Sequence, residues 1–200
     1  MSFFETLRAD LAAHVDPRRH TGVRFWLRAL AKLALTPAVQ VVLIYRISAV
    51  LYRSPLTRPA AFALRSLTVV WGGTEIHPAA QIGPGFCLTH SQMVLVGEGV
   101  TIGSHVRMSH GVSIGGDPGR VGGDHAGWPV IGNGVEIGLH AIVLGPVTVG
   151  DHAVISAKAM VVKDVPAHAV VAGTPARLVR MLPEDYPKYG EHYEATRRHR

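Results

Sequence analysis

The stretch Phe86–Gly119, FCLTHSQMVLVGEGVTIGSHVRMSHGVSIGGDPG, decides the fold. Aliphatic residues return in it at every sixth position, in the series Val96, Ile102, Met108 and Ile114. This period fits neither an α-helix, with about 3.6 residues per turn, nor an amphipathic strand, with a period of about two. It is typical of hexapeptide β-helices, in which each short strand places one apolar residue in the core and then turns.

The same period continues on both sides of this stretch. Its other key residues are Ile82, Leu88, Val94, Ile131, Ile137, Val143, Val149, Ile155 and Val161. Glycine often follows a key residue, as at Gly97 and Gly103, and the strand positions are rich in β-branched residues. Asn133 and Asp151 provide turn residues between strands. The sequence therefore predicts a mainly β fold, a parallel β-helix over residues 71–181.

Residues 1–70 show helical spacing instead and are predicted to form an N-terminal α-helical segment. Leu27, Leu30, Leu33 and Ala34 recur in this way, and so do Val42, Tyr45, Ser48, Ala49 and Tyr52. We expect the apolar run Leu33–Tyr45 to be a buried helix, since 13 residues are too few to span a bilayer. Such a segment would cover the first coil of the β-helix. Residues 182–200 are predicted to be a polar C-terminal tail.

Composition narrows the function classes. The single cysteine, Cys87, excludes a disulfide scaffold and a cysteine-rich zinc site. It fits a reducing compartment, and the N-terminus lacks the order of a signal peptide, so we expect a cytoplasmic protein without a membrane span. The arginine-rich helical segment leaves membrane-surface association as an alternative. The net charge of +6 is not arranged as nucleic-acid binding requires and favours a polyanionic small molecule.

The repeat breaks between Ile114 and Ile131. The intervening segment, GGDPGRVGGDHAGWPV, holds six glycines and two prolines, and it is predicted to leave the coil as a loop over 115–130. Arg120, Asp124, His125 and Trp128 lie on this segment. Polar and aromatic side chains of these kinds favour a loop that forms the wall of a binding site over a loop that the β-helix merely tolerates.

Several runs resemble the serine O-acetyltransferases, which are hexapeptide-repeat acyltransferases. These runs are YRISAVLY, EIHPAAQIGPGFCLTHSQMVLVGE, HGVSIGGD, GGDHAGWPVIGNGVEIG and the closing VVAGTPARLVR. The resemblance covers Val39–Arg180 and implies a left-handed parallel β-helix. It also implies a homotrimer with acetyl-CoA bound between neighbouring subunits. The helical half is shorter than in typical members, so pairing of trimers into a dimer of trimers stays open.

The resemblance implies transfer of acetyl from acetyl-CoA to the hydroxyl of a small acceptor, L-serine or a related hydroxylated metabolite. His90 matches the family's catalytic histidine, and histidine is the side chain suited to accept and return a proton near neutral pH. Glu75 stands where the family has an aspartate that orients the histidine. The pair His90 and Glu75 is therefore the predicted catalytic unit.

Two departures from the family concern the acceptor. Thr89 stands where the family has an aspartate that helps hold the substrate's amino group, and threonine carries no charge for that. The loop has Gly122-Gly123-Asp124-His125 and lacks the arginine that follows the aspartate in the family. Thr89, Asp124 and His125 are the predicted substrate-binding residues. A sugar or exopolysaccharide-precursor hydroxyl is the alternative acceptor.

The resemblance also points to a cofactor site. Its predicted residues are Gly115, Gly116, Ala157, Lys163, Arg177 and Arg180. Glycines allow a thioester arm to lie along the backbone, and cations suit the phosphates of acetyl-CoA. No metal is expected.

Two rival functions follow from other features. His105 and His110, with His77 or His90, resemble the metal ligands of γ-class carbonic anhydrases and would make a metal-dependent hydratase. A non-catalytic hexapeptide scaffold that binds a partner through its helical half is the third hypothesis.

Overall fold

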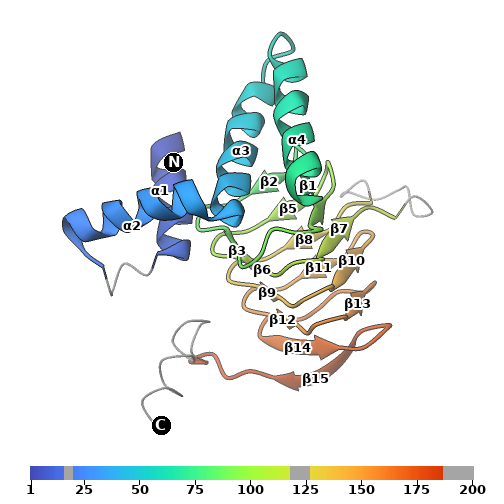
Figure 1. Ribbon diagram of the computed structural model, residues 1–200. Coiled ribbons are helices and arrows are strands. Elements are labelled where there is room, and N and C mark those ends of the chain that lie inside the picture. The colour runs from blue at the N-terminus through green and yellow to red at the C-terminus, as the bar shows by residue number, and fades with distance from the viewer. Residues whose placement is uncertain (16–19, 118–126, 187–200) are drawn as a thin grey trace.

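The computed structural model describes residues 1–15, 20–117 and 127–186 (Figure 1). Within this part the chain begins with helices and continues as stacked coils of short strands. The helices are α1 (Phe3–His14), α2 (Gly22–Leu35), α3 (Pro37–Tyr52) and α4 (Arg58–Gly72).

The strands form three sheets that wrap around one core, and each of the first four coils contributes one strand to each sheet. Sheet 1 contains β1 (Glu75–Ile76), β4 (Leu95–Val96), β7 (Ser113–Gly115), β10 (Ile142–Leu144) and β13 (Met160–Val161). Sheet 2 contains β2 (Gln81–Ile82), β5 (Thr101–Ile102), β8 (Val130–Ile131) and β11 (Thr148–Val149). Sheet 3 contains β3 (Cys87–Leu88), β6 (Arg107–Met108), β9 (Glu136–Ile137), β12 (Val154–Ile155), β14 (Ala169–Ala172) and β15 (Arg177–Met181).

All strand pairs are parallel except β14 with β15, where the chain turns back and closes the last coil. The key residues of the six-residue period fill the interior, and each of them is at most 8% exposed. Residues two positions before a strand residue, such as Val100 and Val106, complete the same core. The core predicted from the period is confirmed.

Three corners join the sheets, and each is named here for the sheets that it connects. Residues 89–94, 109–112, 138–141 and 156–159 form the 3–1 corner. The 1–2 corner leads from sheet 1 to sheet 2, and the 2–3 corner leads from sheet 2 to sheet 3. At the 2–3 corner the amide of Ser104 donates to Asn133 Oδ1 (2.9 Å), and the amide of Asn133 donates to Asp151 Oδ1 (2.6 Å). That second hydrogen bond lowers the pKa of Asp151.

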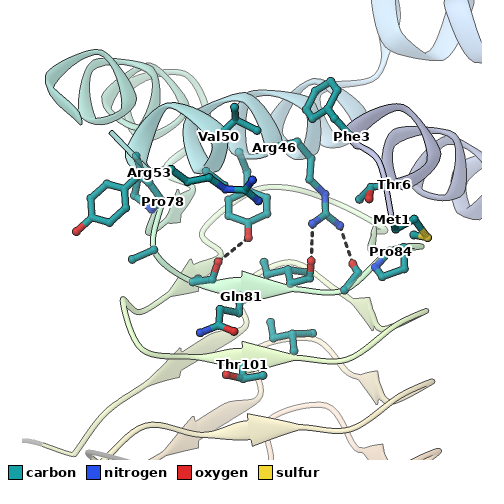
Figure 2. A pocket seen from close by; sticks show the side chains of 18 residues that line it. Met1, Phe3, Thr6, Arg46, Val50, Arg53, Pro78, Gln81, Pro84 and Thr101 are labelled. Atoms are coloured by element: carbon teal, nitrogen blue, oxygen red, sulfur yellow. Dashed lines mark hydrogen bonds between the residues drawn. The ribbon is translucent and has the colours of Figure 1, made fainter. Parts of the chain in front are cut away.

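The helical half rests on the first coil through α1 and α3. The Arg46 guanidinium of α3 binds the Asp10 carboxylate of α1 at 2.8 Å, and it donates to the carbonyls of Ile82 (2.5 Å) and Gly83 (2.6 Å). Asp10 also accepts from the amide of Phe86 at 2.9 Å. An open cleft of about 670 Å³ lies beneath α3, and Arg46 is one of the residues that line it. Figure 2 shows the hydrogen bonds of Arg46 to the first coil.

The expectation of one buried helix over Leu33–Tyr45 is wrong. Helix α2 ends at Leu35, α3 begins at Pro37, and the two helix axes are bent by 89°. Thr36 adopts an extended conformation because the following proline ring disfavours the helical region there. Among the described residues, no single helix is long and apolar enough to cross a membrane. Only the bent pair of α2 and α3, taken together, has the length and composition that a membrane span requires.

Candidate functional site

His90 lies at the 3–1 corner of the first coil, where the chain departs from its regular step. From Cys87 to Leu95 the chain takes eight residues, whereas from Arg107 to Ser113 it takes six. The two additional residues widen this turn, and they leave Thr89 and His90 exposed at its surface. A side chain on a widened, exposed turn is available to a substrate in a way that the core residues are not.

Three histidines form a column along this corner. The rings of His90 and His110 meet edge to face with centroids 5.8 Å apart, and the rings of His110 and His140 do so at 4.9 Å. Each of these histidines comes from a different coil, and the parallel register stacks them. The predicted base therefore has an imidazole as its direct neighbour.

Glu75 lies on β1, at the start of sheet 1. Its carboxylate accepts a hydrogen bond from the Arg65 guanidinium of α4 at 2.5 Å, and both side chains are partly exposed. In the part of the chain that the structure describes, no hydrogen bond joins Glu75 to His90. The orienting role of Glu75 stays a prediction.

A buried hydrogen bond fixes the turn that carries His90. The Thr74 hydroxyl donates to the carbonyl of Ser91, and both residues are buried. Thr74 directly precedes Glu75, so this bond ties the start of sheet 1 to the turn of His90. Backbone placement, rather than a side-chain hydrogen bond, brings the two predicted catalytic residues into one region.

The outer face of sheet 1 lies between His90 and the end of β7, where the long segment that leads to β8 begins. Its outward residues include Leu95, Ser113, Ile142 and Met160, which are half-buried or exposed. Five strands spaced by about 4.8 Å give this face a length of about 19 Å. It suits an extended ligand with apolar character, with His90 at the end nearest the helices.

Trp128 lies just before β8, at the end of the long segment between β7 and β8. Its indole packs over Gly97, Gly99 and Gly116, and a Cβ on Gly116 would lie only 3.3 Å from its ring. The glycines thus leave room for the ring at the 1–2 corner. Asp124 and His125, predicted to bind the substrate, lie outside the described residues.

The predicted cofactor residues are spread over two corners and a sheet. Gly115 is the last residue of β7 and Gly116 follows it at the 1–2 corner, and Lys163 is exposed at the same corner of a later coil. Ala157 is exposed at the 3–1 corner. The exposed Arg177 and Arg180 belong to β15 of sheet 3. One protomer does not gather these residues at a single point.

The histidines proposed for a metal lie apart. His105 occupies the 2–3 corner, whereas His110 occupies the 3–1 corner. His77 packs edge to face against Tyr52 and Phe62, and burial lowers its pKa. The described residues contain no group of three or more His, Cys, Asp or Glu side chains that could hold a metal ion.

A buried contact beneath the strand that leads to His90 was missed by the sequence analysis. The His14 ring of α1 hydrogen-bonds the carbonyls of Asp10 (2.8 Å) and Leu88 (3.3 Å), and it interacts with the Cys87 thiol. Burial is the largest single influence on His14 and lowers its pKa, but the hydrogen bond and charge of Cys87, together with the bonds to the carbonyls of Asp10 and Leu88, raise the pKa overall. Conversely, burial raises the pKa of Cys87, but the hydrogen bond and charge of His14, together with the nearby cations Arg107 and Lys32, lower the pKa overall. These residues lie more than 70 positions apart, so no local pattern links them.

Comparison with known proteins identifies close relatives of one kind. The chain is 37% identical over 147 residues to serine acetyltransferase of Helicobacter pylori, covering 74% of this chain and 84% of that protein. It is 41% identical over 137 residues to serine acetyltransferase 2 of Arabidopsis thaliana, covering 68% of this chain and 42% of that protein. No family model matches the chain.

Solved structures agree with these relatives. Serine acetyltransferase from Brucella abortus in complex with coenzyme A has a TM-score of 0.78 at 32% identity, covering 90% of this chain and 69% of that one. Soybean serine acetyltransferase complexed with serine has a TM-score of 0.75 at 35% identity, covering 89% and 70%. The predicted fold class, a left-handed parallel β-helix behind an N-terminal helical segment, is confirmed. The chain spans only about two fifths of the length of serine acetyltransferases 2 and 4 of Arabidopsis thaliana.

Proposed function

The chain belongs to the serine acetyltransferase family, and from this premise we propose that it transfers acetyl from acetyl-CoA to the hydroxyl of a small acceptor. L-serine is the first candidate acceptor. The observation that carries the proposal is the exposed His90 on a widened turn, at the end of the long outer face of sheet 1. The structures of relatives with coenzyme A and with serine support both substrates.

In the proposed reaction His90 is the general base. It takes the proton of the acceptor hydroxyl while the oxygen attacks the thioester carbon of acetyl-CoA. The carbon–sulfur bond then breaks, and His90 returns the proton to the leaving thiolate. The acetyl group passes directly to the acceptor, so no acyl-enzyme intermediate forms.

Glu75 is the orienting residue in this proposal. A carboxylate beside the base stabilises the imidazolium that forms during transfer. Arg65 holds the Glu75 carboxylate from the side of α4 and limits its freedom. The exposed His90 ring is free of hydrogen bonds within the described part of the chain, so its rotation on substrate binding costs little.

Thr89, Asp124 and His125 are assigned to the acceptor. Because Thr89 carries no charge, it offers a hydroxyl rather than a partner for an ammonium group. This single observation favours a second candidate, an acceptor without a free amino group such as a sugar hydroxyl. The two candidates share the reaction and differ only in the acceptor.

Acetyl-CoA is assigned to Gly115, Gly116, Ala157, Lys163, Arg177 and Arg180. Because these residues lie at two corners and on sheet 3, a complete site needs surfaces of two subunits. We therefore propose a homotrimer that shares each cofactor site between neighbouring subunits. A dimer of trimers is the alternative assembly. The single cysteine supports the cytoplasm as the compartment.

The test is release of free thiol from acetyl-CoA, with L-serine beside a panel of other amino acids, amino alcohols and sugars. Turnover with L-serine supports serine acetylation, and turnover with a sugar alone supports the second candidate. Absence of thiol release with every acceptor refutes the acetyltransferase proposal and favours the non-catalytic scaffold.

His90→Asn should lower kcat by about two to four orders of magnitude. The matched control is His105→Asn, since His105 has a positive φ that asparagine tolerates and lies at the 2–3 corner. The control should retain nearly full activity. Equal losses in both variants would remove His90 from the role of base.

A further inference from the structure

Helix α2 exposes an apolar stripe that the packing of the chain does not use. Its buried side, Phe25 and Ala29, packs into a small cluster with α1 and α3. Leu33 packs against this cluster as well, whereas five large apolar side chains of α2 are half or more exposed: Val23, Trp26, Leu27, Leu30 and Leu35. Four of these, at positions 23, 26, 27 and 30, recur at helical spacing and form one continuous stripe.

A row of cations runs along the same helix beside the stripe. Arg24, Arg28 and Lys32 follow one another at four-residue spacing, and all three are exposed. One turn of a helix separates each from the next, so they lie on a common side. Helix α2 therefore has a buried side, an exposed apolar side and an exposed basic side.

The stretch of sequence that contains α2, α3 and α4 carries no carboxylate. Between Asp16 and Glu75 the chain contains no Asp or Glu, whereas Lys and Arg occur nine times. The cations of α2 therefore have no acidic neighbours on α2, α3 or α4. An ordinary surface mixes both signs of charge, and this one presents a single sign together with apolar side chains.

We propose that α2 docks on an anionic lipid surface, lying flat with its apolar stripe in the headgroup region. Helices that bind in this way combine Trp and Leu on one side with Lys and Arg on the other. Trp26 is suited to the boundary between headgroups and acyl chains. The basic row supplies attraction to acidic headgroups, which the stripe alone does not provide.

Charge decides against a second copy of the chain as the occupant. A twofold dimer would set the same patch against itself, and Arg24 and Arg28 would face their own equivalents with no carboxylate between them. An anionic surface neutralises the same residues. Figure 1 shows α2 extending from the foot of α3 to the side of the coils, so it lies at the outside of the chain.

Vesicle flotation with the full chain tests the proposal. Vesicles of phosphatidylcholine with about 30% phosphatidylserine should carry the protein at about 0.05 M salt, and vesicles of phosphatidylcholine alone should carry far less. Raising the salt to about 0.5 M should weaken binding by at least about tenfold. Equal binding to both kinds of vesicle, or to neither, overturns the proposal.

Two variants separate the contributions. Arg24→Gln with Arg28→Gln should weaken binding to the anionic vesicles about 30-fold, since each basic residue contributes about fivefold. Leu27→Ser with Leu30→Ser should weaken it by at least about tenfold. Both pairs are exposed, so neither change disturbs the core.

Leu56→Ser is the matched control, because Leu56 is 89% exposed and lies in the turn between α3 and α4. It should leave binding unchanged, and a loss with this variant would place the docking element in that turn and overturn the assignment to α2. The oligomeric state of the Leu27→Ser/Leu30→Ser protein is measured by light scattering. A smaller assembly together with unaltered vesicle binding would show that a second copy covers the stripe.

Discussion

Replacing Arg46 by methionine tests whether one buried ion pair holds the helical half to the β-helix. Arg46 and Asp10 are 7% and 2% exposed, so the pair is almost free of solvent. The guanidinium makes two hydrogen bonds to the carboxylate, at 2.8 and 3.1 Å, and one to each of the carbonyls of Ile82 and Gly83. All of these bonds join α3 to elements distant in sequence.

Methionine fills a similar volume but removes every donor. The Asp10 carboxylate then keeps only the amide of Phe86 and stays buried without a counter-charge. Removal of one partner from a buried pair costs about 3–5 kcal/mol of the free energy of unfolding. With a urea m-value of about 2 kcal/mol/M, the unfolding midpoint should fall by about 2 M.

The assay is urea unfolding followed by far-UV circular dichroism at a fixed protein concentration, because assembly would also contribute to stability. Arg53→Met is the matched control: Arg53 is an exposed arginine of the same region, and its loss should cost less than about 0.5 kcal/mol. Adding Asp10→Asn to Arg46→Met should recover part of the loss, since it removes the uncompensated charge. A cost below about 1 kcal/mol for Arg46→Met, or strict additivity in the double variant, would refute the reasoning.

Two further substitutions and one change of pH probe other parts of the molecule. Gly99→Ala places a methyl group in the space of the Trp128 indole, so it should lower kcat/KM by tenfold or more in the thiol-release assay. Thr101→Ala is the control and should leave kcat/KM unchanged. Asp151→Ala removes an acceptor from the amide of Asn133 and should cost at most about 1 kcal/mol at pH 7, because the site is exposed to solvent. The lowered pKa of Asp151 gives stability that is present above pH 3.8 and lost as the pH falls through the folded-state pKa, so urea midpoints of the variant and the parent should converge there.

The six-residue period predicted the core because it reports burial directly. In a β-helix every coil repeats the same environment, so the six-residue step, restarted at Val96 and at Ile131, predicts the interior from Ile82 to Val161. The helical half followed no such rule. The apolar run through Leu33 and Tyr45 looked continuous in hydropathy, but the conformational restriction before Pro37 divided it into two helices.

The candidate site was predictable only in part. Resemblance gave His90 and Glu75, since motif positions transfer along the chain. The partners that the structure adds, His110 at 5.8 Å from His90 and Arg65 at 2.5 Å from Glu75, depend on register between coils and on the placement of α4. Neither depends on a local pattern. The contact of His14 with Leu88 is likewise set by how α1 docks.

Departures from the period mark the site more directly than the period itself. A regular coil sends its apolar residues inward and closes its backbone hydrogen bonds with the next coil, so it offers few groups to a ligand. Two coils break this rule. One coil has two additional residues before Leu95. In the other coil, Ser113 and its strand partner Ile142 are 29 positions apart, whereas Leu95 and its strand partner Ser113 are 18 positions apart. The first departure exposes His90 at one edge of sheet 1, and the second begins at the opposite edge. We therefore expect a substrate to bind along the face of sheet 1 that lies between them.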